Sequence, residues 1–242
     1  MLETIRKGKT FIVLLSIFAS IGILIIFLFS KEQIHIEINK FHNVFFDFFF
    51  KYITHLGSGW LFVLAFFVLL FVRFRFSLII ALSGIVCGIV IQFLKRFVFS
   101  DVLRPVAFFK DSVDIRLVPG VEMANFNSFP SGHSAAAFCL FFCLAIFYAD
   151  QKKYIGWLCF VLALLIAFSR TYLSQHFFED IVTGSLIGFC VSFIFLSFCL
   201  KTESKFWNSS IKIRAKRVKG KSNSVFEEEK ILKEEVMEQQ KI

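Results

Sequence analysis

Residues 155–200 have the sequence IGWLCFVLALLIAFSRTYLSQHFFEDIVTGSLIGFCVSFIFLSFCL, in which two apolar runs flank the polar stretch SRTYLSQHFFED at residues 169–180. Each run approaches the roughly 20 residues with which an α-helix crosses a bilayer. The polar stretch brings an arginine, a histidine and an aspartate to the edge of this apolar sequence. Ionisable groups beside membrane segments are functional candidates by default. We therefore predict two membrane helices joined by a functional turn.

The rest of the chain has the same character. Apolar residues make up 57% of the sequence, Phe alone accounts for 37 of 242 residues, and 19% are charged. A soluble protein of this length could not hide so much apolar surface. Six apolar runs lie at residues 11–29, 59–72, 76–94, 134–148, 155–168 and 181–200. The second, fourth and fifth are short, so they must recruit flanking residues or pack against protein. The predicted fold is all-α, an integral membrane bundle of six transmembrane helices.

Two segments near the N-terminus each have two interpretations. Basic residues precede the first run, as in a signal peptide, but the length of the run and the absence of a small-residue cleavage pattern after it favour an uncleaved anchor. Residues 34–52 mix apolar and polar side chains, which predicts a short interfacial amphipathic helix. A surface helix that faces the protein core without a lipid role is almost as compatible with this pattern.

Positive charges mark four regions on one side of a six-helix chain. They are the segment before the first run, the loops at Arg73 and Lys152, and the tail after residue 200. The positive-inside rule places both termini in the cytoplasm. We predict a membrane domain over residues 1–200 and a charged cytoplasmic tail over residues 201–242. The net charge of +9 is concentrated in this tail, which suits anionic lipid headgroups, although a solvated tail without a specific function is the simpler interpretation. No nucleic-acid partner is expected.

His176 and Asp180 stand four residues apart in the polar stretch. If a helix already includes Phe177, the two side chains share one helical face. The carboxylate can then accept a proton from one imidazole nitrogen and leave the other free to attack. A structural alternative explains these two residues about equally well: the histidine and the aspartate would simply bond each other at the start of a helix, with no catalytic role.

Two weaker signals precede this pair in the sequence. Pro130-Ser131-Gly132-His133 stands directly before an apolar run, which predicts a helix start whose free N–H groups can bind an anion. Lys95, Arg96, Arg104 and Pro105 form a cationic cluster after the third run, and the planar guanidinium suits phosphate oxygens. Taken alone, the first is equally a capped turn and the second a set of snorkelling cations.

Together these motifs resemble those of the type 2 phosphatidic acid phosphatases, which share a site design with vanadium haloperoxidases. The family pattern is lysine through arginine-proline, then Pro-Ser-Gly-His, then Ser-Arg, five residues, His, three residues and Asp. The second and third motifs match with both spacings intact. The first departs from the pattern, because eight residues instead of six separate Lys95 from Arg104, and Arg96 is an alternative to Lys95. The motifs cover residues 95–180, and the family architecture would extend over residues 11–200.

The resemblance implies a role for each motif residue. His176 would attack phosphorus and form a phosphohistidine, Asp180 would orient it, and His133 would protonate the leaving oxygen and then activate water. The phosphoryl oxygens would be bound by Lys95, Arg104, Ser131, the backbone N–H of Gly132, and Arg170. These roles suit phosphoryl transfer, which depends on positioning and positive charge. Because the cations are side chains, no metal or other cofactor is expected.

The predicted function is hydrolysis of a phosphomonoester or pyrophosphate on a membrane lipid. All three motifs fall on the side of the membrane opposite the basic loops. We therefore expect the active site on the non-cytoplasmic face of the membrane, and we expect that membrane to be a bacterial inner membrane. The candidate substrates are undecaprenyl pyrophosphate, phosphatidylglycerol phosphate, phosphatidic acid and phosphorylated lipid A. Two alternatives stay open: a lipid phosphotransferase that passes the phosphoryl group to another acceptor, and a non-catalytic lipid-binding or transport protein.

Overall fold

A computed structural model describes residues 1–110, 112–152, 154–199 and 209–211 of the chain. Within these segments all regular structure is helical. The predicted tail therefore lies outside the described residues, apart from residues 209–211, and its division from the membrane domain stays a prediction.

Each of the six apolar runs forms a helix, so the all-α prediction is confirmed. In chain order these helices are α1 (Leu2–Leu28), α4 (Gly59–Leu70), α5 (Phe74–Phe93), α7 (Gly132–Phe147), α8 (Ile155–Tyr172) and α9 (Phe178–Cys199). Four helices in the described part of the chain are long and apolar enough to cross a membrane, or up to five if the bent pair that ends in α4 counts as one span. The sixth helix, α7, has only 16 residues. The number of six membrane spans stays a prediction.

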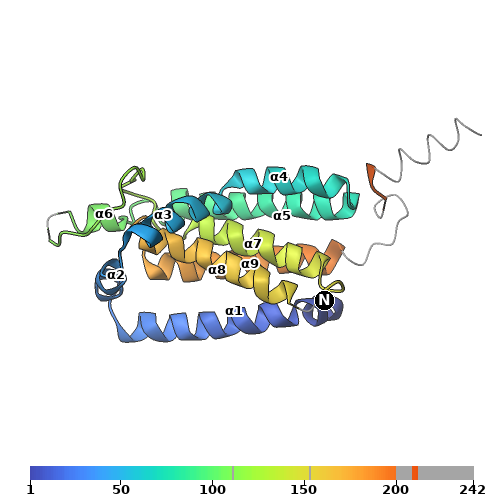
Figure 1. Cartoon of the computed structure of the whole chain (residues 1–242), viewed down its shortest axis with the longest axis horizontal. Helices are drawn as coiled ribbons and strands as arrows, with labels where there is room; N and C mark the ends of the chain where they lie inside the picture. Colours follow the sequence, from blue (N-terminus) through green and yellow to red (C-terminus); the bar gives the residue numbers. More distant parts are fainter. Residues whose placement is uncertain (111, 153, 200–208, 212–242) are drawn as a thin grey trace, which may run out of the picture.

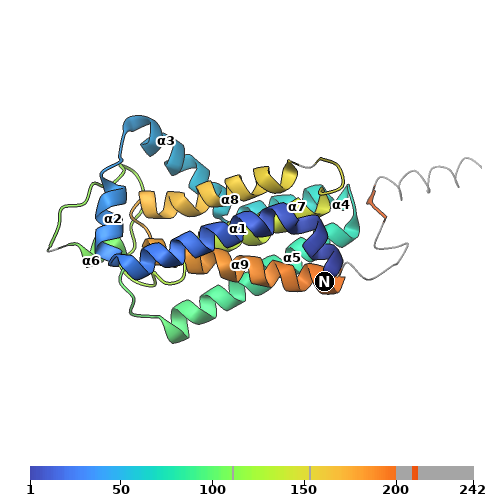
Figure 2. The same cartoon turned by 90° about the horizontal axis from the view of Figure 1, so that it is seen from below.

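Helix α7 occupies the centre of the bundle, where it contacts α1, α5, α8 and α9 (Figures 1 and 2). Its sequence is apolar on every side, which is typical of a fully surrounded helix. At 1.5 Å per residue it is about 24 Å long, less than the thickness of the hydrocarbon core. Because protein surrounds it, α7 can be shorter than its neighbours.

Aromatic packing fixes the neighbours of α7. The ring of Phe11 on α1 lies 5.9 Å from that of Phe138, 5.2 Å from that of Phe142 and 5.5 Å from that of Phe160 on α8. Offset and edge-on ring pairs at these separations stabilise a core beyond the area that they bury. The abundant phenylalanine of the sequence thus joins three helices at one point.

Helices α7 and α9 approach so closely that their backbones touch. A Cβ added at Gly188 of α9 would overlap the carbonyl oxygen of Ala135 on α7, and one added at Gly184 would overlap that of Ser131. The first turns of the two helices are also tied together, because the N–H of Ser131 donates to the carbonyl of Asp180 over 3.0 Å. This close packing places the second and third sequence motifs side by side.

The segment predicted as one interfacial helix forms two short helices, α2 (Lys31–Asn39) and α3 (Val44–Ile53), followed by the 3-10 turn η1 (Thr54–Gly57). The division has a local cause. The side chain of Asn43 accepts the N–H of Phe46 and so begins a new helix.

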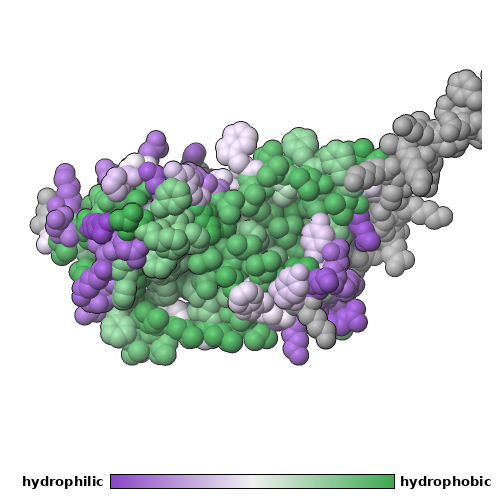
Figure 3. All heavy atoms as spheres, viewed as in Figure 1, coloured by the Kyte–Doolittle hydropathy of each residue, from purple (hydrophilic) through white to green (hydrophobic). Residues whose placement is uncertain are grey.

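Several phenylalanines of this segment are exposed. Phe41 and Phe45 are each 71% exposed, and Phe48 is 66% exposed. Figure 3 shows apolar side chains over the middle of the molecule and hydrophilic side chains gathered at its two ends. Exposed aromatic groups near such a polar end suit the boundary between lipid and water, in line with the interfacial interpretation.

Candidate active site

The three motifs meet at one end of the bundle, opposite the N-terminus. Figure 1 shows this end on the left, where α2, α3 and the short helix α6 (Pro105–Phe108) cover the ends of the long helices. Residues 99–131 form the loop that carries α6 and leads into α7. Segments from distant parts of the sequence therefore surround one small region.

His176 lies in the short turn between α8 and α9, and its side chain pairs with Asp180 in the first turn of α9. The imidazole Nδ1 is 3.2 Å from Oδ2 of Asp180. That same oxygen accepts the N–H of Phe177 over 2.9 Å and the hydroxyl of Ser128 over 2.5 Å. The carboxylate is therefore held by three donors and favours a proton on Nδ1. Nε2 is then the unprotonated nitrogen available for attack.

Burial and charge keep this imidazole neutral. His176 is 1% exposed. Loss of solvent lowers its pKa well below the ordinary value, and the positive charges of Lys95, Arg104 and Arg170 lower it further. His176, the predicted nucleophile, is therefore held in the unprotonated form that attack would require.

Arg170 lies in the last turn of α8 with its guanidinium inside the protein. Its Nη1 donates to Oγ1 of Thr54 over 2.7 Å, whereas its buried Nε has no hydrogen-bond partner among the described residues. A buried donor without a partner is costly, and an anion in the site would satisfy it. Binding of a phosphate here would explain why the buried Nε of Arg170 has no partner within the described part of the protein.

Arg104 and Lys95 approach from the loop side. Nε of Arg104 donates to the carbonyl of Phe126 over 3.0 Å, and Nη1 is 3.4 Å from the carbonyl of Gln175. Lys95 lies in the π-helical turn η2 (Leu94–Val98) that follows α5, and its Nζ donates to the carbonyl of Asn127 over 2.8 Å. Both cations are thus fixed by neutral carbonyl groups, which leaves their charge available to a ligand.

The second motif begins α7. The hydroxyl oxygen of Ser131 caps the helix by accepting the N–H of Ser134. Gly132 and His133 follow as the first helical residues, and His133 packs against Gly57, where an added Cβ would lie 3.1 Å from the His133 carbonyl oxygen. The predicted helix start is confirmed. The phosphate contacts of Ser131 and Gly132 stay a prediction.

A polar cavity of about 570 Å³ opens at this end of the molecule. Its lining residues are Lys51, Thr54, His55, Arg104, Gly120, Val121, Glu122, Met123, Ala124, His133, Arg170, Leu173 and Gln175. His176 is not among them, so attack on a bound phosphate requires a small shift of neighbouring side chains, as is common between free and bound active sites.

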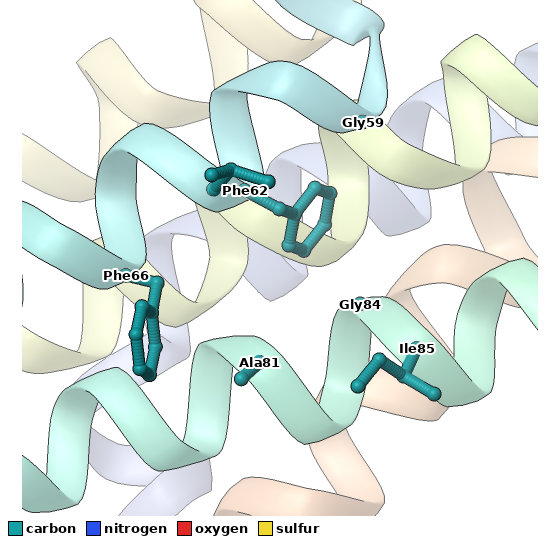
Figure 4. A pocket seen from close by; sticks show the side chains of 7 residues that line it. Gly59, Phe62, Phe66, Ala81, Gly84 and Ile85 are labelled. Atoms are coloured by element: carbon teal, nitrogen blue, oxygen red, sulfur yellow. The ribbon is translucent and has the colours of Figure 1, made fainter.

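A second hollow, of about 360 Å³, lies between α4 and α5. Figure 4 shows Phe62 and Phe66 of α4 facing α5, where Ala81, Gly84 and Ile85 complete the lining. No side chain around this hollow is polar, so it cannot bind a phosphate. The polar cavity is the candidate active site, because the motif residues Arg104, His133 and Arg170 line it.

Three positioning residues were not predicted from the sequence. Thr54 holds Arg170, and Ser128 holds Asp180, as described above. His35 of α2 is fully buried, and its Nε2 lies 3.2 Å from Oγ of Ser174, which has a positive φ of 54° in the turn that carries His176. Burial lowers the pKa of His35 to about 4, so it acts as a neutral group. Only Ser128 had a signal in the sequence, its position just before the Pro-Ser-Gly-His motif.

The two candidates for the first motif lie in different surroundings. Lys95 is 9% exposed and points to the site loop, whereas Arg96 is exposed. Lys95→Ala should therefore lower kcat/KM for phosphate release about 100-fold, the scale on which preorganised charge acts, and Arg96→Ala should change it less than about three-fold. Steady-state kinetics of the two purified variants test this difference. Equal, mild effects would mean that Lys95 has no role in phosphate binding.

Among the described residues, no group of three or more His, Cys, Asp or Glu side chains could hold a metal ion.

The sequence matches the PAP2 superfamily over residues 73–203, a region that includes all three motifs. Phosphatidylglycerophosphatase B of Bacillus subtilis is 34% identical over 87 residues, which cover 33% of this chain and 42% of that protein. The matches to curated relatives span 42–53% of the length of those relatives.

Two crystal structures have a similar fold. LpxE of Aquifex aeolicus is 27% identical with a TM-score of 0.60, and the alignment covers 69% of this chain and 94% of that one. The first transmembrane PAP2-type phosphatidylglycerolphosphate phosphatase from Bacillus subtilis also has a TM-score of 0.60, at 23% identity, covering 83% of this chain and 99% of that one.

Proposed function

Because this chain belongs to the PAP2 superfamily, we propose that it hydrolyses a phosphomonoester or pyrophosphate of a membrane lipid through a phosphohistidine at His176. The apolar helices make it an integral membrane protein, and its relatives are lipid phosphatases. The observation that carries the proposal is the buried His176–Asp180 pair beside Arg104, Arg170 and the polar cavity.

The proposed reaction has two steps. In the first, Nε2 of His176 attacks phosphorus, the bond from phosphorus to the lipid oxygen breaks, and His133 gives its proton to that oxygen. The bound phosphate dianion favours the protonated form of His133 needed here. In the second, His133 accepts a proton from water as the water oxygen attacks the phosphohistidine. Inorganic phosphate leaves, and His176 returns to its neutral form with Nε2 unprotonated.

The cations stabilise both steps. Negative charge spreads over three equatorial oxygens in the transition state, and the side chains of Lys95, Arg104 and Arg170 converge on the same region. Asp180 stabilises the positive imidazole ring that forms on attack, in the manner of the acidic member of a catalytic triad.

The test of this function is phosphate release by the purified full-length protein in detergent. The panel contains phosphatidic acid, phosphatidylglycerol phosphate, undecaprenyl pyrophosphate and phosphorylated lipid A. Release from at least one lipid, with free water as the acceptor, supports the proposal. Transfer of the phosphoryl group to an added lipid acceptor, or binding without release, would replace hydrolysis by one of the two alternative functions.

We propose that the reaction is independent of metal ions. Exhaustive treatment with EDTA should leave the rate of phosphate release within about two-fold of the untreated value. Vanadate should inhibit, because it resembles the pentacoordinate transition state. Activity lost to the chelator and restored by a divalent cation would contradict this mechanism.

We also propose that the site faces away from the cytoplasm, with both termini in the cytoplasm. Single cysteines at Asn125, an exposed residue in the site loop, and at Lys152, an exposed residue between α7 and α8, report on the two ends in a background without native cysteines. The first should react with a membrane-impermeant thiol reagent on intact cells, and the second only after the membrane is opened. The reverse labelling pattern would place the site in the cytoplasm.

A further inference from the structure

The polar cavity extends beyond the residues assigned to phosphate transfer. Lys51 near the end of α3 and His55 in η1 line the same cavity as Arg104, His133 and Arg170. Because Lys51 and His55 are four residues apart on a continuous helical segment, they occupy one face of it. Two basic side chains that the proposed reaction does not use are therefore presented to the substrate cavity.

The charge of the core site already matches one phosphate group. With His133 neutral, Lys95, Arg104 and Arg170 provide three positive charges and Asp180 one negative charge, so their sum is +2, which equals the charge of a phosphomonoester dianion in magnitude. The proton on His133 adds one charge, which passes to the leaving oxygen in the first step. Lys51 lies outside this balance. Glu122 also lines the cavity, but it is exposed, and solvent screens its charge.

Both side chains retain hydrogen-bonding capacity. Nζ of Lys51 donates to the carbonyl of Pro119 over 2.7 Å, and an ammonium group has two further donors. The same Nζ lies 2.7 Å from the point where a Cβ on Gly120 would stand, so the loop holds it in place. The imidazole of exposed His55 has no hydrogen-bond partner in the described part of the chain. A ligand can therefore engage a positioned ammonium and a free imidazole together.

The position of His55 indicates which part of a lipid substrate Lys51 and His55 would contact. Besides the polar cavity, His55 borders an apolar groove of about 470 Å³ on α4, whose lining includes Trp60, Leu64 and Phe67. The hydrocarbon part of a lipid is on the leaving-group side of the bond that breaks, and it must reach apolar surroundings. His55 therefore lies where the polar cavity meets an apolar groove that can receive a hydrocarbon chain, and Lys51 lines the polar cavity with it.

Thr54 connects the two regions. It stands next to His55 in η1 and accepts a hydrogen bond from Arg170 of the core site over 2.7 Å. His55 is therefore adjacent in the chain to a hydrogen-bond partner of Arg170, and Lys51, His55 and Arg170 line the same cavity.

We propose that Lys51 and His55 form a second anion subsite, which binds a phosphate group on the leaving-group side of the scissile bond. This inference rests on the function proposed above and narrows its substrate class to lipids with two phosphates. The second phosphate is either adjacent to the first, as in a pyrophosphate, or separated from it by glycerol, as in phosphatidylglycerol phosphate.

The subsite also assists departure of the leaving group. As the bond from Nε2 of His176 to the terminal phosphorus forms, the bond from that phosphorus to the leaving oxygen breaks, and the electron pair stays on that oxygen, which takes the proton of His133. With a pyrophosphate the leaving oxygen belongs to the second phosphate and a lipid monophosphate is released, whereas with phosphatidylglycerol phosphate it belongs to glycerol and phosphatidylglycerol is released. The charge of Lys51 and a hydrogen bond from His55 then stabilise the second phosphate of the leaving group.

The test uses three lipids with the same diacylglycerol part: phosphatidic acid, diacylglycerol pyrophosphate and phosphatidylglycerol phosphate. For Lys51→Met, which keeps the aliphatic stem, and for His55→Ala, kcat/KM is measured on each lipid with the full-length protein. The ratio of kcat/KM for a two-phosphate lipid to that for phosphatidic acid should fall about ten-fold or more, and Lys51→Arg should restore most of it. Lys110→Met, which removes an exposed cation at the same end outside this cavity, is the matched control and should leave the ratio unchanged.

The lipid on which the ratio falls identifies the spacing of the two phosphates. A fall for diacylglycerol pyrophosphate alone assigns adjacent phosphates, and a fall for phosphatidylglycerol phosphate alone assigns separated ones. An equal loss of kcat/KM on all three lipids, or no loss on any, would overturn the subsite. Melting temperatures of the variants in detergent identify any that fail to fold.

A binding measurement separates this inference from the proposed function. If the wild-type protein releases phosphate from no lipid, the function fails, and calorimetric titration with inorganic pyrophosphate and inorganic phosphate still tests the subsite. Tighter binding of pyrophosphate that Lys51→Met abolishes supports it. Equal binding of both anions contradicts a subsite for adjacent phosphates, and a preference for pyrophosphate that survives the substitution contradicts the assignment of Lys51.

Discussion

His176→Ala should abolish phosphate release, with a loss of at least about 10⁴-fold in kcat, because no other group can form the covalent intermediate. Asp180→Asn should lower kcat by about 10²- to 10⁴-fold. An amide at residue 180 can donate to Nδ1 and so favours the wrong tautomer of His176. The side chain of Asp180 also accepts from Ser128 and Phe177, so the amide weakens three contacts at once. The measurement is single-turnover phosphate release with the most active lipid of the panel.

Two controls sharpen this result. Glu179→Gln changes the half-buried carboxylate next to Asp180. It should keep kcat within about three-fold of the wild-type value, because the proposed reaction does not use Glu179. His133→Ala should slow both steps, because His133 protonates the leaving oxygen in the first and activates water in the second, so turnover should fall while the His176 nucleophile is intact. Near-normal turnover by His176→Ala would refute the phosphohistidine mechanism.

Gly188→Ala should destabilise the folded protein by about 3 kcal/mol or more, despite being the smallest possible addition. The new Cβ would overlap backbone atoms of Ala135 on α7, and a backbone in the centre of the bundle cannot move aside as a flexible side chain can. The expected result is a melting temperature in detergent lower by many degrees, or failure to recover folded protein.

Gly88→Ala is the matched control for this substitution. Gly88 lies in α5, and a Cβ there would meet nothing within 4 Å. The same chemical change should therefore leave stability unchanged or raise it by up to about 1 kcal/mol through helix propensity. Equal melting temperatures for the two variants would show that α7 and α9 do not pack backbone to backbone.

The sequence determined the helices because their causes are local. Long apolar runs form helices in lipid, where every backbone N–H and C=O must be paired within the segment. The pairing of His176 with Asp180 was also predicted, but the two side chains do not share a helical face, because α9 begins at Phe178. The carboxylate of Asp180 reaches back across the first turn of α9 to the N–H of Phe177 and to Nδ1 of His176, so the cause is still local. The cap at Ser131 follows in the same way from a small hydroxyl residue before an apolar run. The single interfacial helix expected over residues 34–52 is two helices in the structure, because Asn43 caps the start of a second one.

Tertiary structure decided which polar groups complete the site. Thr54 bonds to Arg170 across 116 positions of sequence, and Ser128 bonds to Asp180 across 52. The burial of Lys95 and the exposure of Arg96 depend on the π-helical turn after α5 and on the loop that packs over it. No local pattern contains these relations. The sequence by itself thus determined the helices and the pair of His176 and Asp180. The cavity that Lys51 and His55 line arose only from packing between helices, because a hydrogen bond or a shared cavity between distant segments exists only once the chain has folded.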